Sequence, residues 1–219
     1  MIEAVIFDMD GVLIDSEPLW KVAQKRAFGQ VGLNMTTEMC NITMGFRTSE
    51  VSQYWFEKTP WAGKTPQEIS DDMISFAMDE IKARGEAMKG VKETLNWLKN
   101  NNYKLALASS SVMRLIDVVV DKLEIRSYFD VIQSAEKEEY GKPHPAVFIT
   151  TAKNLGLNPY QCLVIEDSAN GVIAAKAAKM KVVAIPDPLL ANDKRFAIAE
   201  ASLQNMTQLT RELIESLPL

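Results

Sequence analysis

Short runs of apolar residues recur along the chain, and polar residues follow directly after each of them. The runs are rich in Val, Ile and Leu and lie at Ala4–Phe7, Leu105–Ala108, Leu163–Ile165 and Val182–Ile185. Continuous apolar runs of this length are typical of strands that are buried on both faces of a parallel sheet. The pattern therefore predicts that these segments are neighbouring strands of one sheet.

Between the predicted strands, apolar residues recur at spacings of three and four, which is the period of an amphipathic helix. Val91, Leu95 and Leu98 form one such face, and Val147 and Leu155 belong to another. Because strands and helices alternate, we expect an α/β fold with a doubly wound, mostly parallel sheet, which is a Rossmann-like core.

The segment from Ser16 to Glu86 does not follow this alternation. It contains no convincing strand pattern but several helical ones, with turn-forming residues at Pro60–Gly63 between the last two. The helical stretches are Pro18–Val31, Ser49–Lys58 and Pro66–Ala83. We therefore expect a small all-helical domain, residues 16–86, inserted directly after the first strand.

The remaining residues, 1–15 and 87–219, are expected to form the α/β domain. In open α/β sheets the ligand crevice lies at the carboxyl ends of the strands. The polar residues that follow the predicted strands, or lie in the loop between them, are Asp8 and Asp10, Ser109 and Ser110, Lys142, and Glu166 and Asp167. This order predicts that groups able to bind a metal ion and a phosphate converge on one edge of the sheet.

Asp8 and Asp10 are two residues apart, so their side chains share a face of an extended strand end. With Asp167 they would form an oxygen-rich pocket suited to Mg²⁺, a hard cation that prefers carboxylates and carbonyls. The alternative is that both are ordinary turn or cap residues, as most Asp residues after strands are. The DMDG context and the distant Glu166–Asp167 pair favour the metal site.

Ser109 and Ser110 lie where a strand meets a helix. Serine at that position commonly caps the helix, but the same backbone N–H groups also form an anion site. Lys142 lies in the sequence GKPHP, in which flanking prolines restrict the backbone. A single lysine is usually solvated; this one is interpreted as a positioned cation for a phosphate group.

Composition limits the classes of partner. Hydrophobic residues make up 47% of the 219 residues, the net charge is −5 and the pI is about 5.1. An acidic protein is a poor binder of nucleic acid or anionic membranes, so neither is expected as a partner. The two isolated cysteines, Cys40 and Cys162, indicate a reducing compartment. With no signal peptide or membrane span in view, we expect a cytoplasmic protein, and nothing in the patterning requires more than a monomer.

These residues together resemble the motifs of the haloacid dehalogenase-like hydrolases, over nearly the whole chain. The four segments are Asp8–Ser16 (DMDGVLIDS), Ser109 at the end of LALAS, Lys142 in GKPHP, and Glu166–Asp167 in VIEDSANG. The helical insert resembles the small cap domain of that family. The resemblance implies an enzyme, a phosphoric monoester hydrolase.

The resemblance also implies a role for each matching residue. Asp8 would attack phosphorus and form an aspartyl-phosphate, and Asp10 would protonate the leaving alcohol and then deprotonate water. Mg²⁺ would be bound by Asp8, Asp10 through its backbone carbonyl, and Asp167, with Glu166 acting through a water molecule. The oxygens of the transferring phosphate would be held by Ser109, Ser110 through its backbone, and Lys142.

Within the family the chain resembles the sugar-phosphate phosphatase and β-phosphoglucomutase branch, bacterial hexitol and 2-deoxyglucose-6-phosphate phosphatases in particular. We therefore expect small sugar or polyol phosphates as substrates. Arg47 is a candidate for binding the far end of the substrate, its alternative being a surface arginine. Trp20 stands where the mutases carry a histidine, which disfavours a phosphomutase. A non-catalytic sugar-phosphate sensor is the remaining alternative.

Overall fold

The computed structural model describes residues 1–217, which divide into two compact units. The first, here the core unit, contains residues 1–15 and the described chain from Ala87 onward. The second, here the helical unit, contains residues 16–86. No helix in the described residues is both long enough and apolar enough to cross a membrane.

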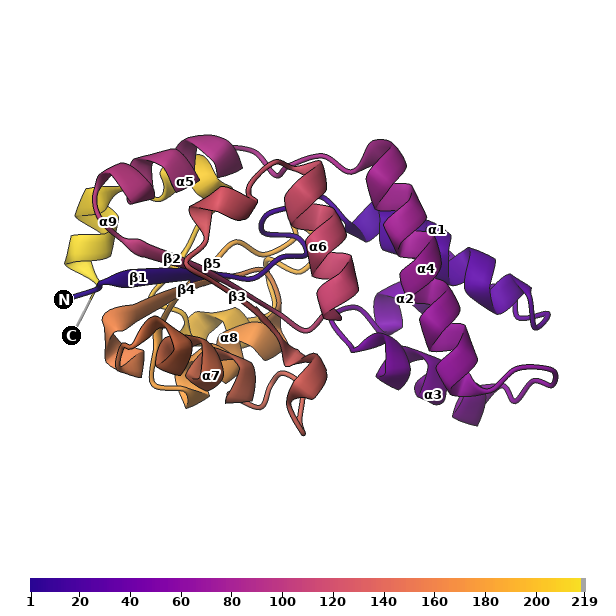
Figure 1. The fold of residues 1–219 in the computed structure, drawn as a ribbon. Coiled ribbons are helices and arrows are strands. Elements are labelled where there is room, and N and C mark those ends of the chain that lie inside the picture. The colour runs from indigo at the N-terminus through magenta and orange to yellow at the C-terminus, as the bar shows by residue number, and fades with distance from the viewer. Residues whose placement is uncertain (218–219) are drawn as a thin grey trace. The chain divides into compact units, whose positions relative to one another are not determined.

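The core unit is built on a parallel sheet with the strand order β3-β2-β1-β4-β5-β6 (Figure 1). The strands are β1 (Ala4–Phe7), β2 (Lys104–Ser109), β3 (Val131–Ser134), β4 (Cys162–Glu166), β5 (Lys181–Ala184) and β6 (Ala201–Ser202). In register, Phe7 of β1 pairs with Leu107 on one side and Ile165 on the other. Every residue of β1 and β4 is buried, as expected for the central strands of a sheet covered on both faces.

Helices cover both faces of this sheet. They are α5 (Val91–Asn100), α6 (Met113–Lys122), α7 (Ala146–Leu155), α8 (Ala169–Ala177) and α9 (Arg211–Ser216). In Figure 1, α5 and α9 lie above the sheet and α7 and α8 below it. Phe148 of α7 and Val172 of α8 are fully buried in one apolar cluster with the β1 residues Ala4 and Ile6. The predicted doubly wound α/β fold is confirmed.

The strand order reverses direction between β1 and β4, because the chain builds the sheet outward first on the β2 side and then on the β5 side. Such a switch point opens a crevice at the carboxyl ends of the two strands. Asp8 follows β1 and Glu166 ends β4, so the topology brings these two residues to the crevice.

The helical unit consists of α1 (Glu17–Gly29), α2 (Thr37–Ile42), α3 (Thr48–Lys58) and α4 (Pro66–Arg84). Its own apolar core includes Phe28 of α1, Trp55 of α3 and Met73 of α4. The start of α4 is fixed by a capping box, in which the Thr65 hydroxyl accepts the Glu68 N–H and the Glu68 carboxylate accepts the Thr65 N–H. The all-helical insert after the first strand is therefore present, with α2 in addition to the expected helices.

Candidate active site

Asp8 lies one residue beyond β1, where its backbone N–H continues the sheet by donating to the carbonyl of Ile165 at 3.0 Å. The residue is only 7% exposed. Burial raises the pKa of its carboxyl group to about 7, with Lys142 opposing this shift and Glu166 and Asp10 adding to it. A buried carboxylate of this kind needs positive charge beside it to remain ionised.

Lys142 supplies one such charge. Its Nζ donates to Asp8 Oδ1 and to Glu166 Oε1, both at 2.6 Å, and approaches the Ala108 carbonyl at 3.4 Å. The side chain is 4% exposed, and its amine lies 4.8 Å from the centre of the Phe148 ring. Burial alone would lower the pKa of Lys142, but the two carboxylates outweigh it and the pKa is raised, so the amine is a permanent cation. Asp8 and Glu166 therefore form ion pairs with the same amine.

Glu166 is fully buried at the end of β4 and is held at both carboxylate oxygens. Its Oε2 accepts the backbone N–H of Ser168 at 2.9 Å and the Ser168 hydroxyl at 3.0 Å. Ser168 is also the N-cap of α8, since its Oγ accepts the N–H of Gly171 at 3.0 Å. The carboxylate of Glu166 therefore has little freedom to leave Lys142.

Asp167 completes an acidic cluster. Asp8, Glu166 and Asp167 each offer a carboxylate oxygen within 4.8 Å of the others. Burial, followed by the charges of Glu166, Asp8 and Asp10, raises the pKa of Asp167 well above its usual range. A Cβ built on Gly11 would lie 2.1 Å from Asp167 Oδ2, so the carboxylate reaches this position only because residue 11 is glycine.

The donor set of this cluster fits a hard divalent cation. All of its donors are carboxylate oxygens, which Mg²⁺ prefers over nitrogen or sulfur ligands. Burial first, and then the charges of neighbouring carboxylates, raises the pKa values of Asp8 and Asp167, and a divalent cation would offset both costs of keeping them ionised. The core unit thus contains a buried acidic cluster suited to a divalent metal ion.

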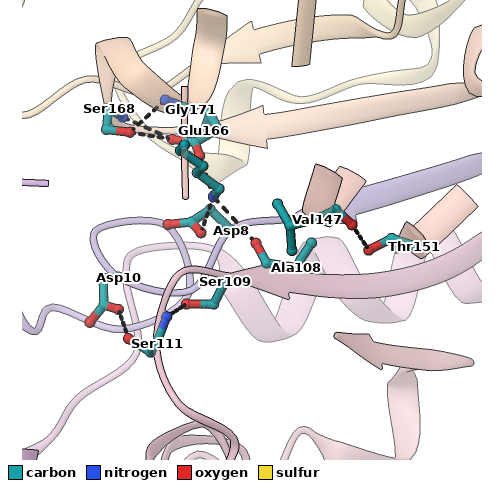
Figure 2. A network of polar contacts seen from close by, with 11 residues as sticks. Asp8, Asp10, Ala108, Ser109, Ser111, Val147, Thr151, Glu166, Ser168 and Gly171 are labelled. Carbon is teal, nitrogen blue, oxygen red and sulfur yellow. Dashed lines mark hydrogen bonds and ion pairs between the residues drawn. The ribbon is translucent and has the colours of Figure 1, made fainter. Parts of the chain in front are cut away.

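Asp10 lies in the loop after β1 and faces the residues that follow β2. The Ser111 hydroxyl donates to Asp10 Oδ2 at 3.1 Å, and the Ser111 N–H donates to the Ser109 hydroxyl at 3.1 Å (Figure 2). Ser109 is buried at the end of β2, and Ser110 beside it is half-buried. The loops after β1 and β2 are therefore joined through Ser111.

Arg47 belongs to the helical unit, whereas the acidic cluster is formed by residues of the core unit. Arg47 precedes α3 as the N-cap residue, and its backbone N–H donates to Glu50 Oε2 at 2.9 Å. Within the core unit, Lys142 joins Asp8 to Glu166, and Ser111 joins Asp10 to Ser109.

Sequence reasoning missed three residues that shape the site: Ser111, Ser168 and Gly171. Ser111 lies one serine beyond the predicted pair in the SSS run, and Ser168 follows the Glu166–Asp167 pair within EDSANG. The helix-capping pattern of Ser168 is a signal that can be read from the sequence. Nothing in the spacing indicates that Gly171 borders the carboxylate of Glu166.

In chemical terms the site offers a buried carboxylate, Asp8, for attack on an electrophile, and a second carboxylate, Asp10, for proton transfer. Lys142 and the acidic cluster provide charges for holding an anion and a metal ion. The family model of haloacid dehalogenase-like hydrolases matches residues 5–185, a span that contains all of these groups.

Proteins of similar sequence support membership of this family. The chain is 38% identical over 209 residues to hexitol phosphatase B of Escherichia coli, with 94% of each chain covered. It is 36% identical over 183 residues to a phosphorylated carbohydrates phosphatase of Thermotoga maritima, which covers 80% of this chain and 81% of the relative. The crystal structure of β-phosphoglucomutase from Clostridium difficile is similar with a TM-score of 0.83 and 28% identity, covering 98% and 96% of the two chains. The chain therefore belongs to the haloacid dehalogenase-like hydrolases and is a phosphatase of that family, as its motifs predict.

Proposed function

We propose that this protein is a Mg²⁺-dependent phosphatase of small sugar or polyol phosphate monoesters that works through an aspartyl-phosphate on Asp8. The observation that carries the proposal is the contact of Lys142 with Asp8 inside the acidic cluster. A lysine there holds one carboxylate oxygen of the nucleophile and offers positive charge to a phosphoryl group beside it. The names of the two phosphatase relatives support carbohydrate phosphates as the substrate class.

In the first half-reaction a carboxylate oxygen of Asp8 forms a bond to phosphorus while the bond from phosphorus to the ester oxygen breaks. Asp10 gives its proton to that oxygen, so the sugar leaves as a neutral alcohol. The Ser109 hydroxyl, the Ser110 backbone N–H and Lys142 hold the non-bridging oxygens. Ser109 ends β2, Ser110 follows it directly, and Lys142 comes from the loop before α7.

In the second half-reaction Asp10, now ionised, takes a proton from water. The water oxygen bonds to phosphorus, the acyl-phosphate bond breaks, and Asp8 is regenerated together with inorganic phosphate. Asp8, Asp167, the Asp10 carbonyl and Glu166, the last through water, would hold Mg²⁺. When bound, Mg²⁺ supplies charge that offsets the repulsion between these carboxylates and the phosphate.

The helical unit is proposed to act as the cap that selects the substrate, and Arg47 to bind its far end. A closing cap would exclude bulk water during phosphoryl transfer. The protein is further proposed to act on small molecules, because its acidic charge disfavours polyanionic partners. It is proposed to act in the cytoplasm because its two isolated cysteines indicate a reducing compartment, and as a monomer because nothing in its patterning requires a partner.

The test is phosphate release from hexose phosphates, hexitol phosphates and nucleoside monophosphates, with Mg²⁺ or with EDTA. Wild type should release phosphate from the carbohydrate esters only with Mg²⁺, and Asp8→Asn should lower kcat by about 10⁴-fold or more because the nucleophile is lost. The Asn must be checked by mass spectrometry, since deamidation restores Asp. Turnover that persists in verified Asp8→Asn protein would refute the proposed nucleophile.

A sugar phosphomutase is the second candidate, favoured by the similarity to β-phosphoglucomutase. Trp20, which packs against the core of the helical unit, stands at the position where a mutase histidine is expected and disfavours it. The two functions separate in one assay. A mutase interconverts hexose 1- and 6-phosphates when primed with a hexose bisphosphate and releases little inorganic phosphate, whereas a phosphatase releases phosphate without a primer.

A further inference from the structure

Ser111 touches the proposed acid–base residue directly. Its hydroxyl donates to Asp10 Oδ2 at 3.1 Å and so connects Asp10 to the loop after β2. We propose that Ser111 is a positioning residue, which holds the Asp10 carboxyl group in place for proton transfer to the leaving oxygen. The inference rests on the proposed phosphatase function and deepens it.

Ser111 is itself fixed at both of its backbone polar groups. Its N–H donates to the Ser109 hydroxyl at 3.1 Å, and its carbonyl accepts the Ser134 hydroxyl at 2.6 Å. Ser109 and Ser134 are register partners in β2 and β3, so both anchors lie at the end of the parallel sheet. These two hydrogen bonds fix the backbone of Ser111 at the end of the sheet. The Ser111 hydroxyl can therefore hold the Asp10 carboxyl group in one orientation.

A hydroxyl group suits a partner that alternates between two protonation states. Asp10 must be a carboxylic acid before the ester bond breaks and a carboxylate before water attacks. A serine hydroxyl can donate to Oδ2 of Asp10 in either state, because a protonated carboxyl group keeps acceptor capacity, and the proton for the leaving oxygen is then carried by Oδ1. Ser111 can thus keep Asp10 in one orientation through both half-reactions.

The same residue affects how Ser109 presents its hydroxyl. Because the Ser109 oxygen accepts the Ser111 N–H, its own hydrogen is directed elsewhere and is available to a phosphoryl oxygen. This second effect depends on the backbone of residue 111 alone. Ser111→Ala therefore removes the contact with Asp10 and keeps the contact with Ser109, which makes it a selective variant.

The decisive experiment compares two esters by kcat/KM, a constant that covers steps up to transfer of the phosphoryl group to Asp8. A hexose 6-phosphate has an alkoxide leaving group that requires a proton, whereas the nitrophenolate of p-nitrophenyl phosphate leaves without one. Ser111→Ala should lower kcat/KM for the hexose phosphate about tenfold, which is near the upper end of what one lost hydrogen bond accounts for. The value for p-nitrophenyl phosphate should change by less than about twofold, because general-acid catalysis adds little there.

Ser216→Ala is the control, because it removes a serine hydroxyl that binds the Leu213 carbonyl in α9 and not Asp10 or Ser111. It should leave the ratio of the two kcat/KM values at the wild-type value. Ser111→Thr, which retains the hydroxyl, should recover the ratio. If the ratio of the two kcat/KM values stays at the wild-type value in Ser111→Ala, whether or not both values fall, the inference is overturned while the proposed function stands. Absence of release from both esters by wild type would overturn the proposed function and this inference with it.

Discussion

Gly171, in the first turn of α8, lies against the carboxylate of Glu166. A Cβ at this position would be 1.7 Å from Glu166 Oε1, the oxygen that binds Lys142. Gly171→Ala should therefore force Glu166 away and release Lys142 from its fixed place beside Asp8. We expect kcat/KM to fall about a hundredfold, the usual cost of displacing a catalytic group by about 1 Å. Steady-state kinetics on a sugar phosphate measures this.

Gly29 provides the control, because it is also a helical glycine and a Cβ placed on it would meet no atom within 4 Å. Gly29→Ala should keep full activity and raise the free energy of unfolding by about 0.5–1 kcal/mol, since alanine is the better helix former. Wild-type kinetics in Gly171→Ala would show that Glu166 does not need its present position.

At this scale the sequence predicts the charged residues better than the groups that hold them. Asp8, Lys142 and Glu166 are recognisable because strand ends and motif spacing mark them. Ser111 and Gly171 act through a hydrogen bond and through the absence of a side chain, and both effects depend on distances that arise only on folding. Such distances are set by the folded backbone, and the spacing of residues along the sequence does not predict them.

Among the structural elements, the junction of α5, β2 and β3 depends on a single carboxylate, that of Asp130. It accepts the Leu105 N–H at 2.8 Å and the Lys99 ammonium at 2.9 Å, and the Asp130 N–H donates to the Leu105 carbonyl at 2.8 Å. Burial would raise the pKa of Asp130, but the Leu105 N–H and Lys99 outweigh it and lower the pKa. The carboxylate thus fixes where β3 begins to pair with β2.

Asp130→Asn should lower the free energy of unfolding by about 1 kcal/mol near neutral pH, because it weakens one charge-assisted bond and one ion pair at a partly exposed site. A folded-state pKa below the unfolded value of about 3.8 adds stability above that value, which is lost as the pH falls through the folded pKa. The difference between wild type and Asp130→Asn should therefore shrink below about pH 4. Urea unfolding at several pH values measures it.

Glu215→Gln is the comparison for Asp130→Asn. Glu215 accepts from Arg211 at 2.8 Å in an i,i+4 pair on the exposed face of α9, where solvent screening leaves an ion pair with little effect on stability. If Asp130→Asn lowers the free energy of unfolding no more than Glu215→Gln does, the contact of Asp130 with Leu105 adds nothing to the stability of the junction.

The sequence predicts long and fully buried elements well and short or half-buried ones poorly. The central strands β1 and β4 have continuous apolar runs, and the predicted strands lie within their bounds. Strand β3 reads VIQS, is half-buried over most of its length and carries no such run. Helix α2 is six residues long, too short to show a helical period. The strand order also had to come from the structure, because pairing between distant strands leaves no local signal.

For the whole molecule, the insertion of the helical unit leaves the sheet undisturbed. The chain departs after Asp15 and returns at Ala87, where Ile14 and Ala87 form an antiparallel bridge and the Met88 N–H donates to the Leu13 carbonyl at 3.0 Å. Backbone contacts within the core unit therefore hold together the two points between which the helical unit is inserted. Changes of sequence within the helical unit, the proposed cap, are therefore expected to leave the acidic cluster unaltered.

Magnesium should accordingly stabilise the core unit alone. Its carboxylates repel one another while buried, so a bound cation adds stability by mass action, about 2.7 kcal/mol at a concentration 100-fold above Kd. Hydrogen exchange with Mg²⁺ against EDTA should show slower exchange around β1 and β4 and unchanged exchange in α1, α3 and α4. Asp167→Asn removes one carboxylate while keeping its shape, and it should abolish the difference. Equal protection of both units, or protection that persists in Asp167→Asn, would place the ion outside this cluster.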